Sequence, residues 1–409
     1  MDKVLFVSVI KNSLIFGVGD ILSKSIPFLL LPYLTRKIGT EDYGELVYYQ
    51  AFIALGLIFI GLSQAGAITR YAFRYGRKSL GVVVTSGHLL SFVLTFLIII
   101  FSSLFTSNAE IIIYIVIISL TNELLAVQLA LRQYEKKAKE YVIINITNGL
   151  LSALVTVLIF EFLSPSPEHR LISIIVANSI VVTASLLFYS NMNKVRYRIT
   201  PARLKLGTCY VIGFGMPLIL HQLSILGKGQ LDRLVIYNLY SPKDLGIYAA
   251  AFQIATILNV FIAAANKALT PFYFERIKNK TINFNWTKKY SFYAMIFVPL
   301  PALVSLVIPD YIYTLFLGEG FVGVGYFVTS FLLGIAALIP YMIMVNFFFY
   351  HGKGGVISLT TGFSLLFYFI YIYIASKYSI NYLPFGLLIS NLMPVFILSF
   401  VGDRWVKYE

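Results

Sequence analysis

The sequence has 409 residues, of which 58% are hydrophobic and only 12% are charged. A soluble domain carries roughly a quarter charged residues, so this chain has too few polar side chains to cover a water-facing surface of its size. Its net charge of +14 would favour nucleic acid in a soluble protein, but in a membrane protein the positive residues are expected to mark one side of the membrane. The composition therefore predicts a multi-pass membrane protein and argues against nucleic-acid binding.

Apolar segments recur along the whole chain, each near the roughly 20 residues that a helix needs to cross a bilayer. Because backbone polar groups inside lipid must be satisfied within each segment, we predict that these segments are helices. Their approximate ranges, in chain order, are 12–34, 44–66, 80–105, 111–131, 142–163, 171–190, 206–227, 246–268, 290–309, 324–349, 355–375 and 382–402. The sequence therefore predicts an all-α membrane protein with about 12 transmembrane helices.

The distribution of basic residues predicts the orientation. The chain before the first apolar segment is short, and that segment is long enough to span, so we expect it to remain as a helix rather than to be cleaved as a signal peptide. If the amino terminus is cytoplasmic, most of the 32 Lys and Arg residues fall in inner segments. Cytoplasmic loops carry such an excess. We therefore predict an even number of helices and two cytoplasmic termini.

A short internal repeat divides the chain. Asp42-Tyr43-Gly44 follows the first predicted helix, and Asp244-Leu245-Gly246 follows the seventh. The offset is almost half the chain, so each half would hold six helices and start on the cytoplasmic side. Some transporters are built from parallel repeats of this kind. We predict two domains, residues 1–204 and 205–409.

Charged residues near the middle of the first predicted helix are candidates for a binding site. Asp20 and Lys24 are four residues apart and share one helix face. A charge at mid-membrane costs about 2.5–3.5 kcal/mol on insertion scales, so it usually faces a cavity or a partner. Two interpretations remain open: an ion pair that only packs helices, or a polar cavity wall in which Lys24 attracts an anionic substrate.

The seventh predicted helix carries a similar stripe. Pro217, His221, Lys228 and Asp232 follow one another on one face, and Arg233 is adjacent. His221 could be an interior hydrogen-bonded residue, and Lys228 and Arg233 could reach the outer interface; alternatively, some of them line a cavity.

The second and eighth predicted helices offer Gln50 and Asn259 on polar faces. Such residues can also serve helix packing alone.

Several absences bear on catalysis. The sequence has no G-x-x-x-x-G-K-S/T phosphate loop, no H-E-x-x-H and no G-x-S-x-G. The single cysteine, Cys209, excludes an internal disulfide and a cysteine-based metal cluster. We predict that the chain is not an enzyme, and we expect no catalytic residue, metal or cofactor.

Motifs in both halves of the chain resemble those of one transporter family. They are Lys11-Asn12-Ser13-Leu14, Pro27 through Arg36, Gly39 through Gly44, Gly215-Met216-Pro217-Leu218, Asp232-Arg233, Leu245-Gly246-Ile247-Tyr248 and Ala268 through Pro271. In this order they resemble Wzx-type polysaccharide repeat-unit flippases, which act in O-antigen, lipopolysaccharide and capsule assembly. The resemblance implies the multidrug/oligosaccharidyl-lipid/polysaccharide exporter fold, with two six-helix bundles around a central cavity. It also implies export of an undecaprenyl-pyrophosphate-linked oligosaccharide across a bacterial inner membrane.

A lipid-linked oligosaccharide flippase is therefore the leading hypothesis. Its partners would be the lipid-linked oligosaccharide, membrane lipids and other polysaccharide-assembly proteins. A drug/cation antiporter of the same superfamily is an alternative, although it would need more membrane carboxylates. A membrane polysaccharide polymerase or glycosyltransferase is another, although the external loops are short for it. The substrate-binding candidates are Lys24, Asp20, Arg233, Lys228, His221, Asn259 and Gln50.

Overall fold

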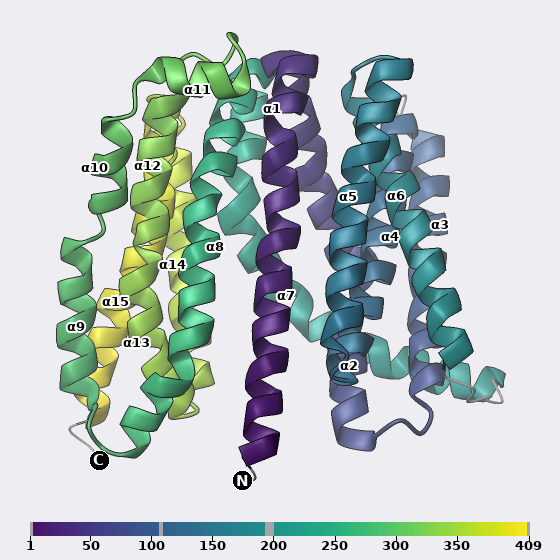
Figure 1. Cartoon of the computed structure of the whole chain (residues 1–409), viewed down its shortest axis with the longest axis horizontal. Coiled ribbons are helices and arrows are strands. Elements are labelled where there is room, and N and C mark those ends of the chain that lie inside the picture. The colour runs from purple at the N-terminus through teal and green to yellow at the C-terminus, as the bar shows by residue number, and fades with distance from the viewer. Residues whose placement is uncertain (1–2, 106–108, 193–199, 407–409) are drawn as a thin grey trace. The chain divides into compact units, whose positions relative to one another are not determined.

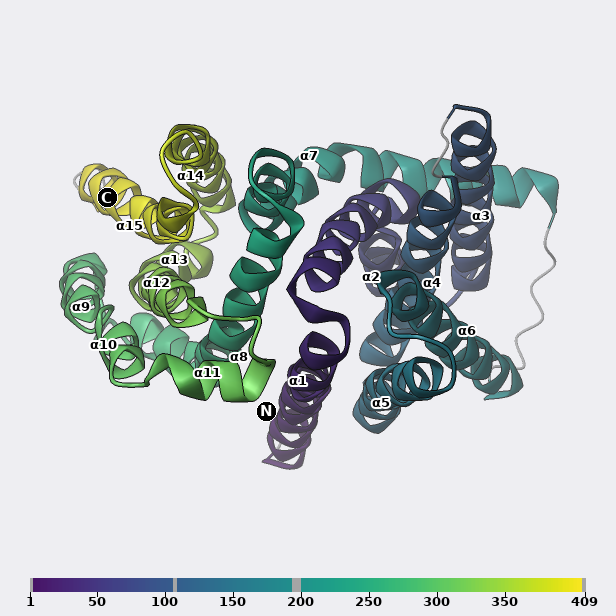
Figure 2. The ribbon, with the colours of Figure 1, turned by 90° about the horizontal axis from the view of Figure 1, so that it is seen from above.

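Helices make up almost all of the described chain (Figures 1 and 2). The computed structural model describes the backbone of residues 3–105, 109–192 and 200–406, and no strand occurs among them. The helices are α1 (Lys3–Gly61), α2 (Gln64–Tyr75), α3 (Leu80–Phe105), α4 (Ala109–Tyr134), α5 (Ala138–Phe162), α6 (Pro167–Met192), α7 (Pro201–Leu239), α8 (Pro242–Lys278), α9 (Phe284–Ile296), α10 (Leu300–Leu306), α11 (Asp310–Leu317), α12 (Val324–Ala336), α13 (Leu338–Tyr350), α14 (Gly354–Ala375), the 3₁₀ helix η1 (Ile380–Tyr382) and α15 (Phe385–Val406).

Within the described residues, 11 segments are long and apolar enough to span a membrane. The first, Ile21–Tyr75, has 55 residues and contains two of the predicted helices. The chain leaves helical geometry between them at Gly39, where φ is 76° and ψ is −174°. Glycine adopts such a conformation without the steric penalty of a Cβ atom. The predicted all-α membrane fold with about 12 helices is confirmed.

Three of the spans are interrupted, and each interruption has a local cause. α1 and α2 are separated by Leu62 and Ser63, whose φ angles of 44° and 53° are left-handed. Pro301 follows the break between α9 and α10, and Pro340 follows the break between α12 and α13. A proline has no N–H for the carbonyl four residues earlier and cannot continue a preceding helix without a distortion.

Contacts between residues divide the chain into two compact units. The first unit comprises Met1–Leu30 and Tyr48–Leu223. Within it, α4 packs against α2, α3, α5 and α6, so α4 is its central helix. Its buried apolar residues form two clusters, one of Ile60, Val116, Leu120, Leu124, Leu125, Ile144, Val181 and Val182, and one of Ile68, Ala72, Leu80, Val83, Val127, Leu131 and Val211. Only 6% of the most apolar stretch of α5 is buried, against 50% for α4, so α5 presents most of its surface outward.

The second unit comprises Leu31–Val47 and Ser224–Glu409. Within it, α12 packs against α8, α10 and α15, and α13 packs against α9 and α15. Helix α7 contributes to both units, since its residues up to Leu223 belong to the first. The sequence-predicted division between residues 204 and 205 stays a prediction.

The two copies of the short repeat meet inside the second unit. Gly44 lies against the backbone carbonyl of Pro242, and Gly246 lies against the backbone carbonyl of Thr40. A Cβ atom at either glycine would overlap the facing carbonyl oxygen. This close backbone approach explains why glycine occupies the last position of both copies.

Candidate functional site: a charged cavity in the second unit

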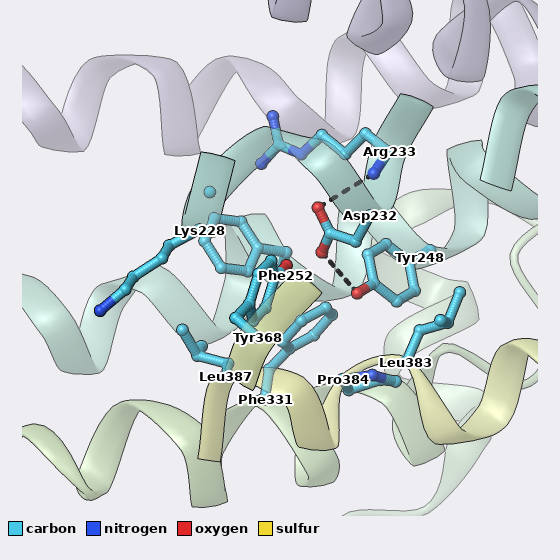
Figure 3. Close-up of a pocket in the computed structure, with 11 residues that line it drawn as sticks. Lys228, Asp232, Arg233, Tyr248, Phe252, Phe331, Tyr368, Leu383, Pro384 and Leu387 are labelled. Carbon is cyan, nitrogen blue, oxygen red and sulfur yellow. Dashed lines mark hydrogen bonds between the residues drawn. The ribbon is translucent and has the colours of Figure 1, made fainter. Parts of the chain in front are cut away.

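Residues of α7, α8, α12, α14 and α15 line a small cavity in the second unit (Figure 3). Its volume is about 50 Å³, which is room for very few water molecules and far too little for a sugar. It is lined by Lys228, Gly229, Asp232, Arg233, Tyr248, Phe252, Phe331, Tyr368, Leu383, Pro384 and Leu387. The three charged residues come from α7: Lys228 and Asp232 are about one turn apart, so the helical period of 3.6 residues places them on one face, and Arg233 follows Asp232 directly.

Asp232 is the buried carboxylate of the cavity, at 7% exposure. The hydroxyl of Tyr248 donates to Asp232 Oδ2 at 2.6 Å, and the backbone N–H of Arg233 donates to Asp232 Oδ1 at 2.9 Å. Tyr368 also lines the cavity. Both tyrosines are buried. The carboxylate is thus stabilised by neutral donors.

The two cations of the cavity bind neutral groups as well. Arg233 Nη1 donates to Gln230 Oε1 at 2.9 Å, and the guanidinium lies 5.1 Å from the ring centre of Phe252. Lys228 Nζ donates to Ser364 Oγ at 2.7 Å. Among the described residues, neither cation forms an ion pair with a carboxylate.

The charge balance of this cavity is therefore positive. Two cations and one carboxylate line the cavity, and Asp232 is already satisfied by hydroxyl and backbone donors. The arrangement favours an anionic group over a cation, because a further positive charge would be repelled by the two cations.

The candidates in the first helix lie in the first unit. The Lys24 side chain is exposed. Gly19 contacts Val142, and Ile26 contacts Gly149, so this part of α1 packs against α5. With 100° between successive helical residues, Lys24 points away from that contact. It makes no ion pair among the described residues, and the side chain of its sequence neighbour Asp20 lies outside them.

The remaining candidates are separate from the cavity. His221 is exposed and Gln50 is half-buried, and both belong to the first unit. Asn259 is exposed on α8. It is seven residues from Phe252, so the two share a face of α8 two turns apart, although Asn259 does not line the cavity.

Two tyrosines that line the cavity with Asp232 were not anticipated from the sequence. Tyr248 is 16 residues further along and Tyr368 lies on α14, so helical spacing on α7 carries no signal for either.

Glu123 was also missed as a site residue. It is 5% exposed, and its carboxylate lies against Gly61, the last residue of α1 before the break into α2.

The arrangement of helices is that of a known class of membrane transporter. A MATE transporter of Vibrio cholerae aligns with a TM-score of 0.62 and 15% identity, covering 98% of this chain and 97% of that chain. A multidrug resistance MATE family transporter of the MOP superfamily, in an outward-facing conformation, aligns with a TM-score of 0.58 and 18% identity over 97% and 96%. A MOP superfamily transporter from Pyrococcus furiosus aligns with a TM-score of 0.57 and 15% identity over the same shares. The chain therefore has a MATE-like transporter fold.

Sequence comparisons then place the chain within a family. The family model described as "Polysaccharide biosynthesis protein" matches residues 9–278. A protein of the Lsg locus of Haemophilus influenzae is 37% identical over 401 residues, covering 98% of this chain and 99% of that protein. An uncharacterized membrane protein of the same organism is 40% identical over 364 residues, covering 88% and 89%. The chain belongs to the polysaccharide biosynthesis protein family, which confirms the resemblance seen in the sequence, and it is a multi-pass membrane protein.

Proposed function

We propose that this protein moves an undecaprenyl-pyrophosphate-linked oligosaccharide repeat unit from the cytoplasmic to the outer leaflet of a bacterial inner membrane. The cargo would cross by alternating access without chemical change, so the protein would be a flippase and not an enzyme. Both termini would be cytoplasmic. Its partners would be the lipid-linked oligosaccharide, membrane lipids and other polysaccharide-assembly proteins.

The positive charge balance of the second unit is the observation that carries this proposal. Lys228 and Arg233 lie in a membrane-crossing helix, where a cation costs about 2.5–3.5 kcal/mol on insertion scales. Among the described residues no carboxylate pairs with either cation. A pyrophosphate would supply the missing anion and accept charge-assisted hydrogen bonds from both side chains. The cavity is too small for the glycan, so only phosphate oxygens would approach it.

Lys24 would contribute from the first unit. Its side chain is exposed within the membrane-crossing part of α1 and points away from the α5 contact. An idle charge at that depth would be unfavourable, so we place the path of the anionic headgroup along this face of α1.

The same charges weigh against the drug/cation antiporter. Such a protein needs carboxylates that can bind a cation. Asp232 has two hydrogen-bond donors, and two cations line the same cavity, which disfavours that use. A polymerase or glycosyltransferase would change the cargo chemically and is tested by the same experiment.

The test is a flipping assay in proteoliposomes. Purified protein is reconstituted with an undecaprenyl-pyrophosphate-linked oligosaccharide labelled in its sugar, and an impermeant glycosidase reports which leaflet holds it. We expect label to move between leaflets while mass spectrometry finds the intact molecule. Arg233→Ala should slow movement at least about tenfold, the value of one charge-assisted contact.

Lys243→Ala is the matched control, since Lys243 is exposed at the start of α8 and does not line the cavity. Wild-type protein that leaves the label in its original leaflet, or that alters the oligosaccharide, would contradict the proposed function.

A further inference from the structure

A second, larger hollow lies in the first unit, where α2, the turn into α3 and the start of α7 meet. Its volume is about 430 Å³, within the range of roughly 300–1,000 Å³ typical of small-molecule sites. It is lined by Tyr71, Tyr75, Ser79, Val82, Val83, Arg203, Leu206, Gly207 and Tyr210, and we call it the tyrosine groove. All of these residues belong to the first unit, and the charged cavity of the second unit shares none of them.

Aromatic rings form the walls of the groove. The ring centres of Tyr71 and Tyr210 are 5.3 Å apart in an edge-to-face arrangement, and those of Tyr71 and Tyr75 are 5.1 Å apart. Tyr75 is 52% exposed, so its ring remains accessible. Gly207 lies directly against Ser86, which brings α7 close to α3.

The hydroxyl of Tyr210 is buried and has no hydrogen-bond partner among the described residues. A buried hydroxyl without a partner is unfavourable, so a ligand that supplied a hydrogen-bonding group would be stabilised there. Ring faces beside a hydroxyl suit a sugar, which presents C–H groups on its faces and hydroxyls at its edges.

The rim of the groove is basic. Arg203 lines it and is exposed. Arg70 and Arg74 are close enough to interact electrostatically with the hydroxyl of Tyr210, and Arg74 lies 5.5 Å from the ring centre of Tyr75. No carboxylate lines the groove. Arginine binds phosphate groups through two parallel hydrogen bonds, so the rim favours a phosphorylated ligand.

We propose that the tyrosine groove binds the diphosphate–sugar headgroup of the lipid-linked glycan before transport. The inference rests on the proposed function, and it adds a loading site distinct from the charged cavity. Arg70, Arg74 and Arg203 belong to segments that the distribution of basic residues predicts to be cytoplasmic, the side from which the cargo would be taken. The rings would stack on the first sugar while the arginines bind the diphosphate.

Direct binding to the full-length protein in detergent tests this assignment. The probe is a short-chain isoprenyl diphosphate carrying one N-acetylglucosamine, and its Kd is measured by thermophoresis. Arg203→Ala should raise the Kd at least about tenfold, because a charge-assisted contact is lost. Tyr75→Ala should raise it several-fold, whereas Tyr75→Phe keeps the ring and should stay within about twofold of wild type.

Each variant has a matched control on the same helix. Lys205 is an exposed cation on α7 and Phe73 is an exposed aromatic residue on α2, and neither lines the groove. Lys205→Ala and Phe73→Ala should bind the probe like wild type. Thermal unfolding of every variant shows that it is folded, and Tyr75→Phe separates stacking from general disruption.

The outcomes are distinguishable. Wild-type affinity in both Arg203→Ala and Tyr75→Ala would overturn the proposal that the tyrosine groove binds the headgroup. The flippase proposal would still stand if Arg233→Ala slows transport. Equal competition by phosphatidylglycerol, with the same loss in both variants, would make the groove a phospholipid site and overturn the assignment of a sugar. A wild-type protein that neither binds the probe nor moves the lipid-linked oligosaccharide would overturn both proposals.

Discussion

Removing the hydroxyl of Tyr248 should destabilise the protein, because the Asp232 carboxylate would lose a hydrogen-bond donor. Tyr248→Phe deletes the 2.6 Å hydrogen bond to Asp232 Oδ2. It keeps the ring contacts, whose centres lie 4.8 Å from Phe331 and 5.6 Å from Phe327. A hydrogen bond to a charged group contributes about 1.5–3 kcal/mol to stability, and one between neutral groups about 0.5–1.5 kcal/mol. We therefore expect a loss of about 2 kcal/mol in the free energy of unfolding.

The second unit contains a matched control for this change. Tyr313 is also buried, but its hydroxyl lies 2.9 Å from the neutral Ser305 Oγ. Tyr313→Phe should cost about 1 kcal/mol. Both variants are measured by reversible unfolding in mixed micelles with increasing SDS, followed by circular dichroism. Equal losses in the two variants would refute the view that Tyr248 stabilises a carboxylate charge.

A double-mutant cycle makes the argument sharper. In an Asp232→Asn background the partner of Tyr248 is neutral, so Tyr248→Phe should then cost only about 0.5–1.5 kcal/mol. The difference between the two backgrounds isolates the interaction of the hydroxyl with the charge. A coupling energy near zero would mean that the hydroxyl acts independently of Asp232.

Three further predictions concern packing, topology and charge. Gly246→Ala should lower the unfolding temperature, because its Cβ would meet a backbone carbonyl at a cost of about 1–3 kcal/mol. Gly362→Ala should leave the unfolding temperature unchanged, because no atom lies within 4 Å of its Cβ. Single cysteines in the loop 164–169 should react with an impermeant thiol reagent in cells with a permeabilised outer membrane, when the native cysteine has been removed. Labelling of cysteines at 136–139 instead would reverse the predicted orientation. Lys24→Ala should abolish surface polysaccharide at normal protein abundance while Lys24→Arg retains more of it, and wild-type polysaccharide in Lys24→Ala would exclude a role in transport.

The membrane fold could be predicted because it depends on local properties of the sequence. An apolar run of about 20 residues specifies a helix in lipid with little help from its neighbours. The interruptions depend on finer detail. The proline breaks at Pro301 and Pro340 follow from a missing N–H, but the left-handed backbone at Leu62 and Ser63 involves residues with no special preference for it. The carboxylate of Glu123, from α4, lies against Gly61 at that break.

The candidate site could be predicted only along one helix. Lys228, Asp232 and Arg233 are neighbours because Lys228 lies about one turn of α7 before the adjacent pair Asp232 and Arg233, and this spacing is visible in the sequence. Tyr248 and Tyr368 lie on two other helices, and nothing in an apolar stretch marks which tyrosine turns inward. Sequence spacing thus identified the charged groups, whereas tertiary packing determines how their charges are compensated.

The reciprocal contact of the two glycines bears on the origin of the fold. Gly44 meets the carbonyl of Pro242, and Gly246 meets the carbonyl of Thr40. In the repeat, Thr40 corresponds to Pro242 and Gly44 corresponds to Gly246. The glycine of each copy therefore contacts the residue that lies four positions before the glycine of the other copy. A two-fold relation between equivalent segments produces such a pattern, because residue i contacts j when j contacts i. An accidental match of three residues would not place both copies face to face with each glycine against the other's carbonyl. The short repeat is therefore best explained as the remaining sequence signal of two related halves, retained where only glycine permits the approach.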